Sequence, residues 1–196
     1  MLRIGLTGPT GSGKSTVTAL MRQWGGVEVL DGDTVAHEVN DSQACAAAIA
    51  RAFPGVRRPD GTVDRRQLAA VVFANPDALR QLVGITFPLI LAECESRMEG
   101  FARAGARACV LDGPTLFESG GDRLCDVIVS VVTPREVRLR RVLERDGITR
   151  EAAEARMKNQ HEDAFYTARS HFVITNSSDL AHLQTEVERC RRFLCL

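Results

Sequence analysis

Five short stretches of the chain have the length and pattern of strands, and several of them are near-continuous apolar runs. Between them, apolar residues recur every three or four positions, which is the spacing of one helix face. Strands with apolar side chains on both faces are typical of a parallel sheet that is covered by helices on both sides. The expected strands are Leu2–Thr7, Val27–Asp31, Ala108–Asp112, Val127–Val132 and Phe172–Thr175.

Helix signals separate these strands. A helix is expected after the first strand, where the apolar positions are Val17, Leu20, Met21 and Trp24. Another helix is expected to start with Thr133 as its cap and Pro134 as its first residue, and to end near Gly147. The last helix has an apolar stripe that consists of Leu180, Leu183, Val187, Cys190 and Leu194.

Residues 34–105 are helical in pattern and contain no convincing strand, so we interpret them as an insertion between the second and third strands. Breaks are expected at Pro54-Gly55, Pro59-Asp60-Gly61, Asn75-Pro76 and Pro88. The remainder, 1–33 and 106–196, forms the predicted core. Parallel strands joined by helices predict an α/β fold with a doubly wound, five-stranded parallel sheet, whose ligands bind at the carboxyl ends of the strands.

Composition and charge narrow the function classes. The chain has 196 residues with 44% apolar content, which suffices for a buried core. Its 25 acidic and 25 basic residues balance, so the field that draws proteins to nucleic acid or anionic lipid is absent. No segment reaches the roughly 18 apolar residues of a membrane span, and the first residues are too short an apolar run for a signal peptide. We expect a cytoplasmic protein that binds neither nucleic acid nor membrane.

The six cysteines form no Cys-x-x-Cys pair and no zinc-like cluster with histidine. We expect free thiols. A redox link between Cys190 and Cys195 is the alternative, although both fall in a helical pattern.

The segment Gly8-Pro9-Thr10-Gly11-Ser12-Gly13-Lys14-Ser15 matches Gly-x-x-x-x-Gly-Lys-[Ser/Thr] in full and lies between a predicted strand and a predicted helix. In such a loop the backbone N–H groups surround the β-phosphate of a nucleotide. The lysine reaches the β- and γ-phosphates, and the hydroxyl of Ser15 binds Mg²⁺. A flexible Gly/Ser turn would explain neither this spacing nor the position of Lys14, because the chain has only one other lysine, Lys158. The motif therefore predicts ATP or GTP binding.

Carboxylates follow two of the predicted strands. Asp31 and Asp33 come at the end of the second strand, and Asp33 could accept a proton from an attacking hydroxyl or bind magnesium through water. It could equally cap the helix that follows. Asp112 closes the third strand and is either a magnesium-side carboxylate or a turn former.

Three arginines, Arg138, Arg141 and Arg145, share one face of the helix after the fourth strand. They could belong to a solvated, salt-bridged helix, since several glutamates lie nearby. Behind a phosphate loop they could instead close over the nucleotide and neutralise charge on the transferred group. Both interpretations can hold for different residues.

The ordered set of motifs resembles the dephospho-CoA kinase family over nearly the whole chain. The segments that carry the resemblance are Ile4–Gly8 with Gly11–Ser15, Leu30–Asp33 with Ala36, Asp60–Arg65 with Leu68 and Val72-Phe73, Leu111–Glu118, Arg141–Gly147 with Arg156 and Gln160, and Val173–Asn176. The resemblance implies a P-loop kinase with a helical acceptor-binding insertion over 34–105 and an arginine-rich lid over about 138–165. The implied activity is ATP-dependent phosphorylation of the 3′-hydroxyl of dephospho-CoA to give coenzyme A, with Mg²⁺ and without a phospho-enzyme.

The resemblance also implies roles for individual residues. Asp33 matches the catalytic base, and Lys14 and Arg141 act with it on the transferred phosphoryl group. The residues implied for ATP are Gly8, Gly11, Ser12, Gly13, Lys14, Ser15, Thr16, Arg145 and Asn176. Magnesium would lie on Ser15, with Asp33 or Asp112 contributing through water. The residues implied for the acceptor are Asp33, His37, Arg65, Phe87 and Pro88, and Arg65 could meet its pyrophosphate bidentately.

Two departures from the family pattern concern the acceptor. His37 stands where the family usually has arginine, and Phe87 precedes Pro88 where the family has a His-Pro pair. These differences keep open a second hypothesis, another small-molecule kinase for a nucleoside, nucleotide or sugar acid. A GTP-dependent switch is disfavoured because Asn176-Ser177-Ser178-Asp179 lacks the lysine of the guanine-reading Asn-Lys-x-Asp motif. A degenerate nucleotide-binding module is disfavoured because every reactive group of the loop motif is present.

Overall fold

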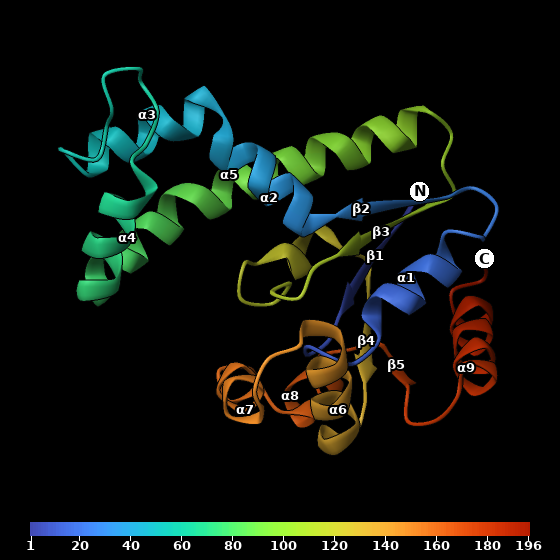
Figure 1. The fold of residues 1–196 in the computed structure, drawn as a ribbon. Coiled ribbons are helices and arrows are strands. Elements are labelled where there is room, and N and C mark those ends of the chain that lie inside the picture. Colours follow the sequence, from blue (N-terminus) through green and yellow to red (C-terminus); the bar gives the residue numbers. More distant parts are fainter. The chain divides into compact units, whose positions relative to one another are not determined.

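The computed structural model describes residues 1–196 as two compact units (Figure 1). The first unit consists of Met1–Asp31 together with Met98–Leu196, and the second of Gly32–Arg97. The second unit therefore interrupts the first between its second and third strands. No helix combines the length and the apolar composition that crossing a bilayer requires.

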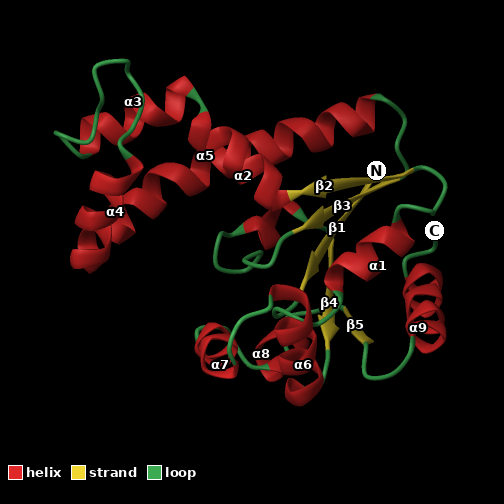
Figure 2. Ribbon diagram, in the orientation of Figure 1, coloured by secondary structure: helices red, strands yellow, loops and turns green.

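The first unit is built on a five-stranded sheet (Figure 2). Its strands are β1 (Leu2–Thr7), β2 (Val27–Asp31), β3 (Ala108–Asp112), β4 (Val127–Val132) and β5 (Phe172–Thr175), at the positions that the sequence predicts. All pairings are parallel, in the order β2-β3-β1-β4-β5. The prediction of an α/β fold with a parallel, doubly wound sheet is confirmed.

The register of the strands brings their carboxyl ends together. Asp112 of β3 pairs with Asp31 of β2 on one side and with Leu6 of β1 on the other. Thr7, the last residue of β1, pairs with Ser130 of β4. Side chains and loops that follow β1, β2 and β3 therefore start from one edge of the sheet.

Helices cover this sheet. They are α1 (Lys14–Met21), the 3₁₀ turn η1 (Gly121–Leu124), α6 (Arg135–Asp146), α7 (Arg150–Lys158), α8 (Asp163–Thr167) and α9 (Leu180–Phe193). The helices α1 and α9 lie side by side (Figure 1). Apolar residues of the sheet, α1 and α9 form one buried core, with Ile4, Val17, Val129 and Val187 among its members. A smaller cluster joins α6 to α7 through Leu139, Val142, Ala153 and Met157.

Three local predictions in this unit are wrong. Trp24 is not part of α1, which ends at Met21, although the side chain is buried in the core. Pro134 is the cap residue of α6 and not its first helical residue, and no side chain caps the helix. The hydroxyl of Thr133 instead donates to the main-chain carbonyls of Ser12 and Asn176, both at 2.9 Å, because this buried position offers it two acceptors from other elements. Leu180 is more than half exposed, because it is the first residue of α9 and lies before the part of the stripe that reaches the core.

The second unit is helical, as predicted, and contains α2 (Gly32–Asp41), α3 (Gln43–Ala52), α4 (Arg65–Ala74) and α5 (Pro76–Arg103), of which residues up to Arg97 belong to it. Its core consists of Cys45, Ile49, Phe53, Val56, Leu68, Val72 and Ala78, with Leu82 and Ile85 packed against them. The expected break at Pro88 is wrong, because α5 continues through it. Proline in a helix interior costs about 3 kcal/mol. Leu82 and Ile85, on the preceding turns, are partly buried against the core of this unit.

All six cysteines are free thiols, as expected, and Cys190 is not linked to Cys195. Cys190 is fully buried, and burial raises its pKa to about 12. Burial also raises the pKa of Cys125 to about 12 and that of Cys94 to about 11. Cys195 is the one exposed thiol, so five of the six cysteines serve as small apolar side chains.

Candidate functional site

The loop between β1 and α1 depends on three glycines with positive φ: Gly8, Gly11 and Gly13. A Cβ atom on Gly8 would collide with the carbonyl oxygen of Val131, and one on Gly13 with the side-chain amide of Asn176. On Gly11 it would come within 2.7 Å of the carbonyl oxygen of Arg138. The loop is therefore packed against β4, α6 and the end of β5, and its shape needs glycine for both conformation and space.

Buried or partly buried hydrogen bonds to three distant segments hold this loop. The carbonyl of Ser12 accepts from the hydroxyl of Thr133 at 2.9 Å and from the amide of Asn176 at 2.8 Å. The N–H of Thr10 donates to the side-chain oxygen of Gln160 at 3.0 Å. The hydroxyl of Ser12 is buried and has no hydrogen-bond partner. Since buried polar groups are normally satisfied, this hydroxyl is available to a ligand.

The amino terminus of α1 is open. Its cap residue is Gly13, so no side chain accepts from the first N–H groups of the helix. Ser15 and Thr16, in the first turn, have exposed side chains. Unsatisfied N–H groups and the positive end of the helix dipole make such a terminus a binding site for phosphate.

Lys14 and Asp112 form an ion pair at the carboxyl edge of the sheet, where both side chains are largely buried. The other carboxylate oxygen of Asp112 accepts from the hydroxyl of Thr18 at 2.7 Å, and the same hydroxyl lies 3.0 Å from the carbonyl of Lys14. Asp112 is thus more than a turn former. It holds the ammonium of Lys14 at the mouth of the phosphate loop.

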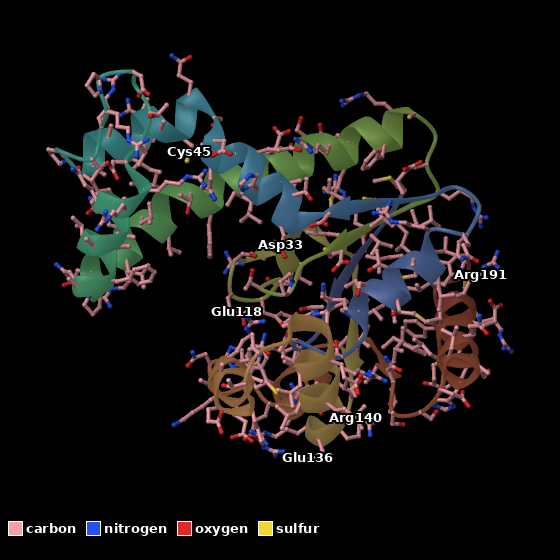
Figure 3. The ribbon with its side chains drawn as sticks, in the orientation of Figure 1. Asp33, Cys45, Glu118, Glu136, Arg140 and Arg191 are labelled. Atoms are coloured by element: carbon pink, nitrogen blue, oxygen red, sulfur yellow. The ribbon has the colours of Figure 1, made fainter.

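The three arginines of α6 have different environments. Arg138 is buried, donates to the carbonyl of Thr133 at 3.0 Å and lies 3.4 Å from Asp163. Arg141 reaches the phosphate loop, with one guanidinium nitrogen 3.4 Å from the carbonyl of Gly11 and the other 3.4 Å from the side-chain oxygen of Asn176. Glu136 and Arg140, which Figure 3 labels, lie on the solvent-exposed face of α6.

Arg145 lies one turn beyond Arg141 and does not contact the loop. It donates twice to Asp146, at 2.7 and 3.0 Å, and Arg156 donates to the same carboxylate at 2.5 Å. These hydrogen bonds, that of Arg145 above all, lower the pKa of Asp146 below its usual value. Of the three predicted arginines of α6, only Arg141 brings its guanidinium to the loop.

Asp33 lies in the first turn of α2, where Figure 3 labels it. It is a residue of the helix itself, since α2 already begins at Gly32. Asp33 follows Asp31, the last residue of β2, whose register partner in β3 is Asp112.

The predicted acceptor residues all lie in the second unit. His37 and Arg65 meet at one carboxylate: Asp41 lies 3.5 Å from the His37 ring and forms an ion pair with Arg65. Phe87 and Pro88 lie together in the middle of α5. All these side chains are partly or largely exposed, in contrast to the phosphate loop.

Only a few side-chain oxygens at this edge of the sheet could bind magnesium, but they include a hydroxyl and a carboxylate. No group of three or more His, Cys, Asp and Glu side chains comes together in the chain. Mg²⁺ in a nucleotide site needs only one or two protein oxygens, because water and phosphate complete its coordination. The Ser15 hydroxyl and the Asp112 carboxylate are oxygens of this kind. The residues present therefore fit a nucleotide-bound Mg²⁺.

Sequence reasoning did not place Thr133, Gln160 or Thr18 at the candidate site, although each supports the loop or its lysine. Thr133 directly follows β4 in the sequence, so its place at the carboxyl edge was a usable signal. Gln160 belongs to the family pattern but bonds a backbone N–H, which leaves no mark on the sequence of the loop.

Comparison with known proteins gives consistent matches. The family model described as dephospho-CoA kinase matches residues 2–182. A dephospho-CoA kinase of Symbiobacterium thermophilum is 39% identical over 98% of this chain and 81% of its own length. One of Rhodopseudomonas palustris is 37% identical over 95% of this chain and 92% of its own.

Solved structures agree with these matches. A protein of Thermus thermophilus superposes with a TM-score of 0.78 at 34% identity, covering 99% of this chain and 96% of its own. The dephospho-CoA kinase of Campylobacter jejuni gives a TM-score of 0.70 at 26% identity, with 98% and 96% covered. Shikimate kinase of Acinetobacter baumannii shares the fold alone, with a TM-score of 0.55 at 20% identity over 100% of this chain and 94% of its own.

Proposed function

The chain belongs to the dephospho-CoA kinase family, and from this premise we propose which of its residues perform the transfer from ATP to dephospho-CoA. The reaction is the last step of coenzyme A synthesis. The 3′-hydroxyl of dephospho-CoA attacks the γ-phosphorus of ATP, the bond to the bridging oxygen of ADP breaks, and the hydroxyl proton leaves. Catalysis then consists of positioning, charge stabilisation and acceptance of one proton.

The loop from Gly8 to Ser15 binds the phosphates of ATP in this proposal. The observation that carries it is the loop itself: three glycines with positive φ lead into an uncapped helix, with the ammonium of Lys14 beside it. The backbone N–H groups and the first turn of α1, including Thr16, meet the β-phosphate. Lys14 then leaves Asp112 for the β- and γ-phosphates, whose charge is larger than that of one carboxylate.

Mg²⁺ would be held by the hydroxyl of Ser15 and, through water, by Asp112 or Asp33. When bound, it neutralises charge on the phosphates and favours departure of ADP. Asp112 keeps both its oxygens engaged, by Lys14 and by Thr18, so its orientation is fixed before nucleotide binds.

Asp33 is the proposed catalytic base that accepts the proton of the 3′-hydroxyl. A carboxylate suits this task because the proton need move only as the new bond to phosphorus forms. Asp33 is two residues from the end of β2, and two peptide units span at most about 7 Å. The chain itself thus tethers this carboxylate to the strand end that pairs with Asp112.

Arg141 is the proposed lid cation for the transferred phosphoryl group, since its guanidinium already lies at Gly11 and Asn176. Arg145 would need to leave Asp146 to reach ATP, so we assign it a role only when the lid, about 138–165, closes. Asn176 stays a predicted ATP-side residue, and its amide supports the loop at Ser12.

The helical insertion over 34–105 is the proposed acceptor-binding part, with His37, Arg65, Phe87 and Pro88 on the acceptor side. That the chain works in the cytoplasm and without nucleic acid stays a prediction.

The proposed function is tested by ADP release with Mg-ATP and, separately, dephospho-CoA, adenosine, AMP, a pyrimidine nucleotide and gluconate. NMR locates the phosphate of any product. We expect efficient turnover of dephospho-CoA with a new phosphate on the 3′-oxygen. Turnover of another acceptor alone would contradict the assignment and direct attention to His37 and Phe87.

A further inference from the structure

Helix α6 contains the only buried arginine or lysine of the chain, Arg138, which is 6% exposed. Its Nε donates to the carbonyl of Thr133 at 3.0 Å, and a terminal nitrogen of the guanidinium lies 3.4 Å from Asp163 at the start of α8. A guanidinium stays charged in a protein, so its burial is costly unless a carboxylate compensates it. An apolar side chain would avoid this cost, which indicates that the pair serves a purpose other than stability.

Tyr166, in the same short helix as Asp163, shows how little water reaches this pair. Its side chain is 2% exposed, and burial raises its pKa to about 12. The charge of Glu118 adds to this rise, that of Arg138 opposes it, and that of Asp163 adds to it. The Oδ1 atom of Asp163 is buried and accepts no hydrogen bond, so the guanidinium of Arg138 is the group that compensates it. Charges in such dry surroundings attract strongly, and the pair therefore resists separation.

The pair lies at the base of the lid. Arg138 and Asp163 bracket the rest of α6, all of α7 and the chain that leads into α8. Between these two residues, α6 and α7 pack on each other through an apolar cluster of their own. The ion pair thus ties the segment that leaves the sheet after β4 to the segment that returns to it before β5.

Arg138 also belongs to the surface on which the phosphate loop lies. A Cβ atom on Gly11 would come within 2.7 Å of the carbonyl oxygen of Arg138 and within 3.1 Å of its Cα. The side chain of Arg138 holds the carbonyl of Thr133, and the hydroxyl of Thr133 donates to the carbonyl of Ser12 at 2.9 Å. The start of α6 and the loop are therefore held against each other, and Arg138 takes part with both its main chain and its side chain.

Arg141 depends on this anchoring for its place at the loop. It follows Arg138 by three residues, about 4.5 Å along the axis of α6, and lies on the adjoining part of the helix surface. Its contacts with the carbonyl of Gly11 and the side-chain oxygen of Asn176 are both 3.4 Å, which is long for hydrogen bonds. These contacts do not fix the guanidinium alone, so the position of α6 decides where Arg141 reaches the loop.

We propose that Arg138 is a positioning residue for phosphoryl transfer: paired with Asp163, it fixes the start of α6 against the phosphate loop so that Arg141 meets the transferred group. The inference rests on the proposed function, because it takes Arg141 as the cation on that group. Arg138 itself touches neither substrate, since its guanidinium is buried and engaged by Thr133 and Asp163. A misplacement of about 1 Å at a reacting group can cost about 10²-fold in rate, so Arg138 acts on kcat through Arg141.

The first experiment compares Arg138→Met with Arg140→Met. Arg140 lies on the same helix and is exposed to solvent (Figure 3). We expect Arg138→Met to lower kcat about 10- to 100-fold while the KM values for ATP and dephospho-CoA stay within about threefold, because the hydroxyl of Thr133 still holds the loop. Arg140→Met should leave all three constants within about twofold, as an exposed substitution does.

The second experiment adds Arg138→Met to Arg141→Ala. If Arg138 acts through Arg141, the double variant keeps a kcat within about threefold of that of Arg141→Ala, because residues that act as a unit are not additive. If Arg138 only stabilises the fold, the two losses in kcat multiply.

A third variant separates positioning from stability. Arg138→Met leaves the carboxylate of Asp163 without its cation, which destabilises the fold, whereas Arg138→Met/Asp163→Asn removes both charges. We expect this paired variant to melt within about 4 °C of the unmodified protein and to keep the loss in kcat, since the anchor of α6 is still missing. If Arg138→Met alone does not fold, the paired variant takes its place in the first two experiments.

Three results would overturn the proposal. They are an unchanged kcat in Arg138→Met, a full further loss of kcat when Arg138→Met is added to Arg141→Ala, and recovery of kcat together with the melting temperature in the paired variant. The last two would indicate an effect on stability alone. Failure of the proposed function is distinguishable, since the unmodified protein would then not phosphorylate dephospho-CoA, or Arg141→Ala alone would leave kcat unchanged.

Discussion

The phosphate loop and the helical unit hold their charged groups in different ways. At the loop, main-chain groups form the site, and hydrogen bonds to Thr133, Asn176 and Gln160 fix it, the first two of them buried. In the helical unit, exposed side chains form the predicted site, and His37 and Arg65 converge on Asp41, a carboxylate of the protein itself.

This difference indicates how each substrate is met. In the proposed function, ATP enters a loop whose shape is set beforehand, so binding need not order the backbone. In the proposed acceptor site, the acceptor would have to displace Asp41 from Arg65 and order exposed side chains. We therefore expect changes at the loop to act on catalysis and ATP, and changes in the helical unit to act on the KM of the acceptor.

The largest effect is expected for Lys14→Ala. Removing a cation from the transferred phosphates should lower kcat/KM for ATP by about 10³- to 10⁵-fold. Lys158→Ala is the matched control, since the chain has no other lysine and this one is exposed at the end of α7. Steady-state ADP release measures both variants. A loss of less than tenfold in kcat/KM for ATP in Lys14→Ala would contradict the role of the loop.

Asp33→Asn should lower kcat by about 10²- to 10⁴-fold, the contribution of general base catalysis. The KM for ATP should change little, because the amide keeps the shape of the side chain while it cannot accept the proton. Single-turnover kinetics separates the chemical step from binding. Near-normal turnover would show that another group accepts the proton.

Arg141 and Arg145 provide a sharper test, because they occupy the same helix in different surroundings. Arg141→Ala should lower kcat by about 10²- to 10³-fold, as removal of one transition-state donor does. Arg145→Ala should cost less than about tenfold, since its guanidinium is paired with Asp146. The reverse order in kcat would mean that the lid rearranges enough to exchange the two arginines.

The smallest expected effect concerns how well the core of each unit protects its own cysteine thiols. Cys195 is the only exposed thiol, and burial raises the pKa of Cys45 in the helical unit as it does that of Cys190 in the sheet unit. We expect one fast-reacting thiol with Ellman's reagent and none in Cys195→Ser. A second fast thiol that disappears in Cys45→Ser would show that the helical unit opens readily.

Much of the fold could be predicted from the sequence because several of its strands are near-continuous apolar runs of the right length. All five fall where expected, and burial is most complete in β1, β3 and β4, where it leaves little freedom in register or identity. The starts and breaks of helices were harder to predict. Pro88 does not break α5 and Thr133 does not cap α6, because tertiary contacts outweigh local preference at both positions.

The candidate site divides in the same way. The phosphate loop could be predicted because its glycines and Lys14 have a fixed spacing that the chemistry requires. The pairing of Lys14 with Asp112 needed the sheet register, which places residues far apart in sequence at one edge. The different surroundings of Arg141 and Arg145 left no local signal, because they depend on how loops and helices pack.

The most direct test of this division is calorimetric titration of Lys14→Ala with Mg-ATP and, separately, with dephospho-CoA. The account predicts that ATP affinity falls at least about tenfold, since a charge-assisted contact to phosphate is lost. It predicts that affinity for dephospho-CoA stays within twofold of the unmodified protein. An equal loss of both affinities, or unchanged ATP binding, would contradict it.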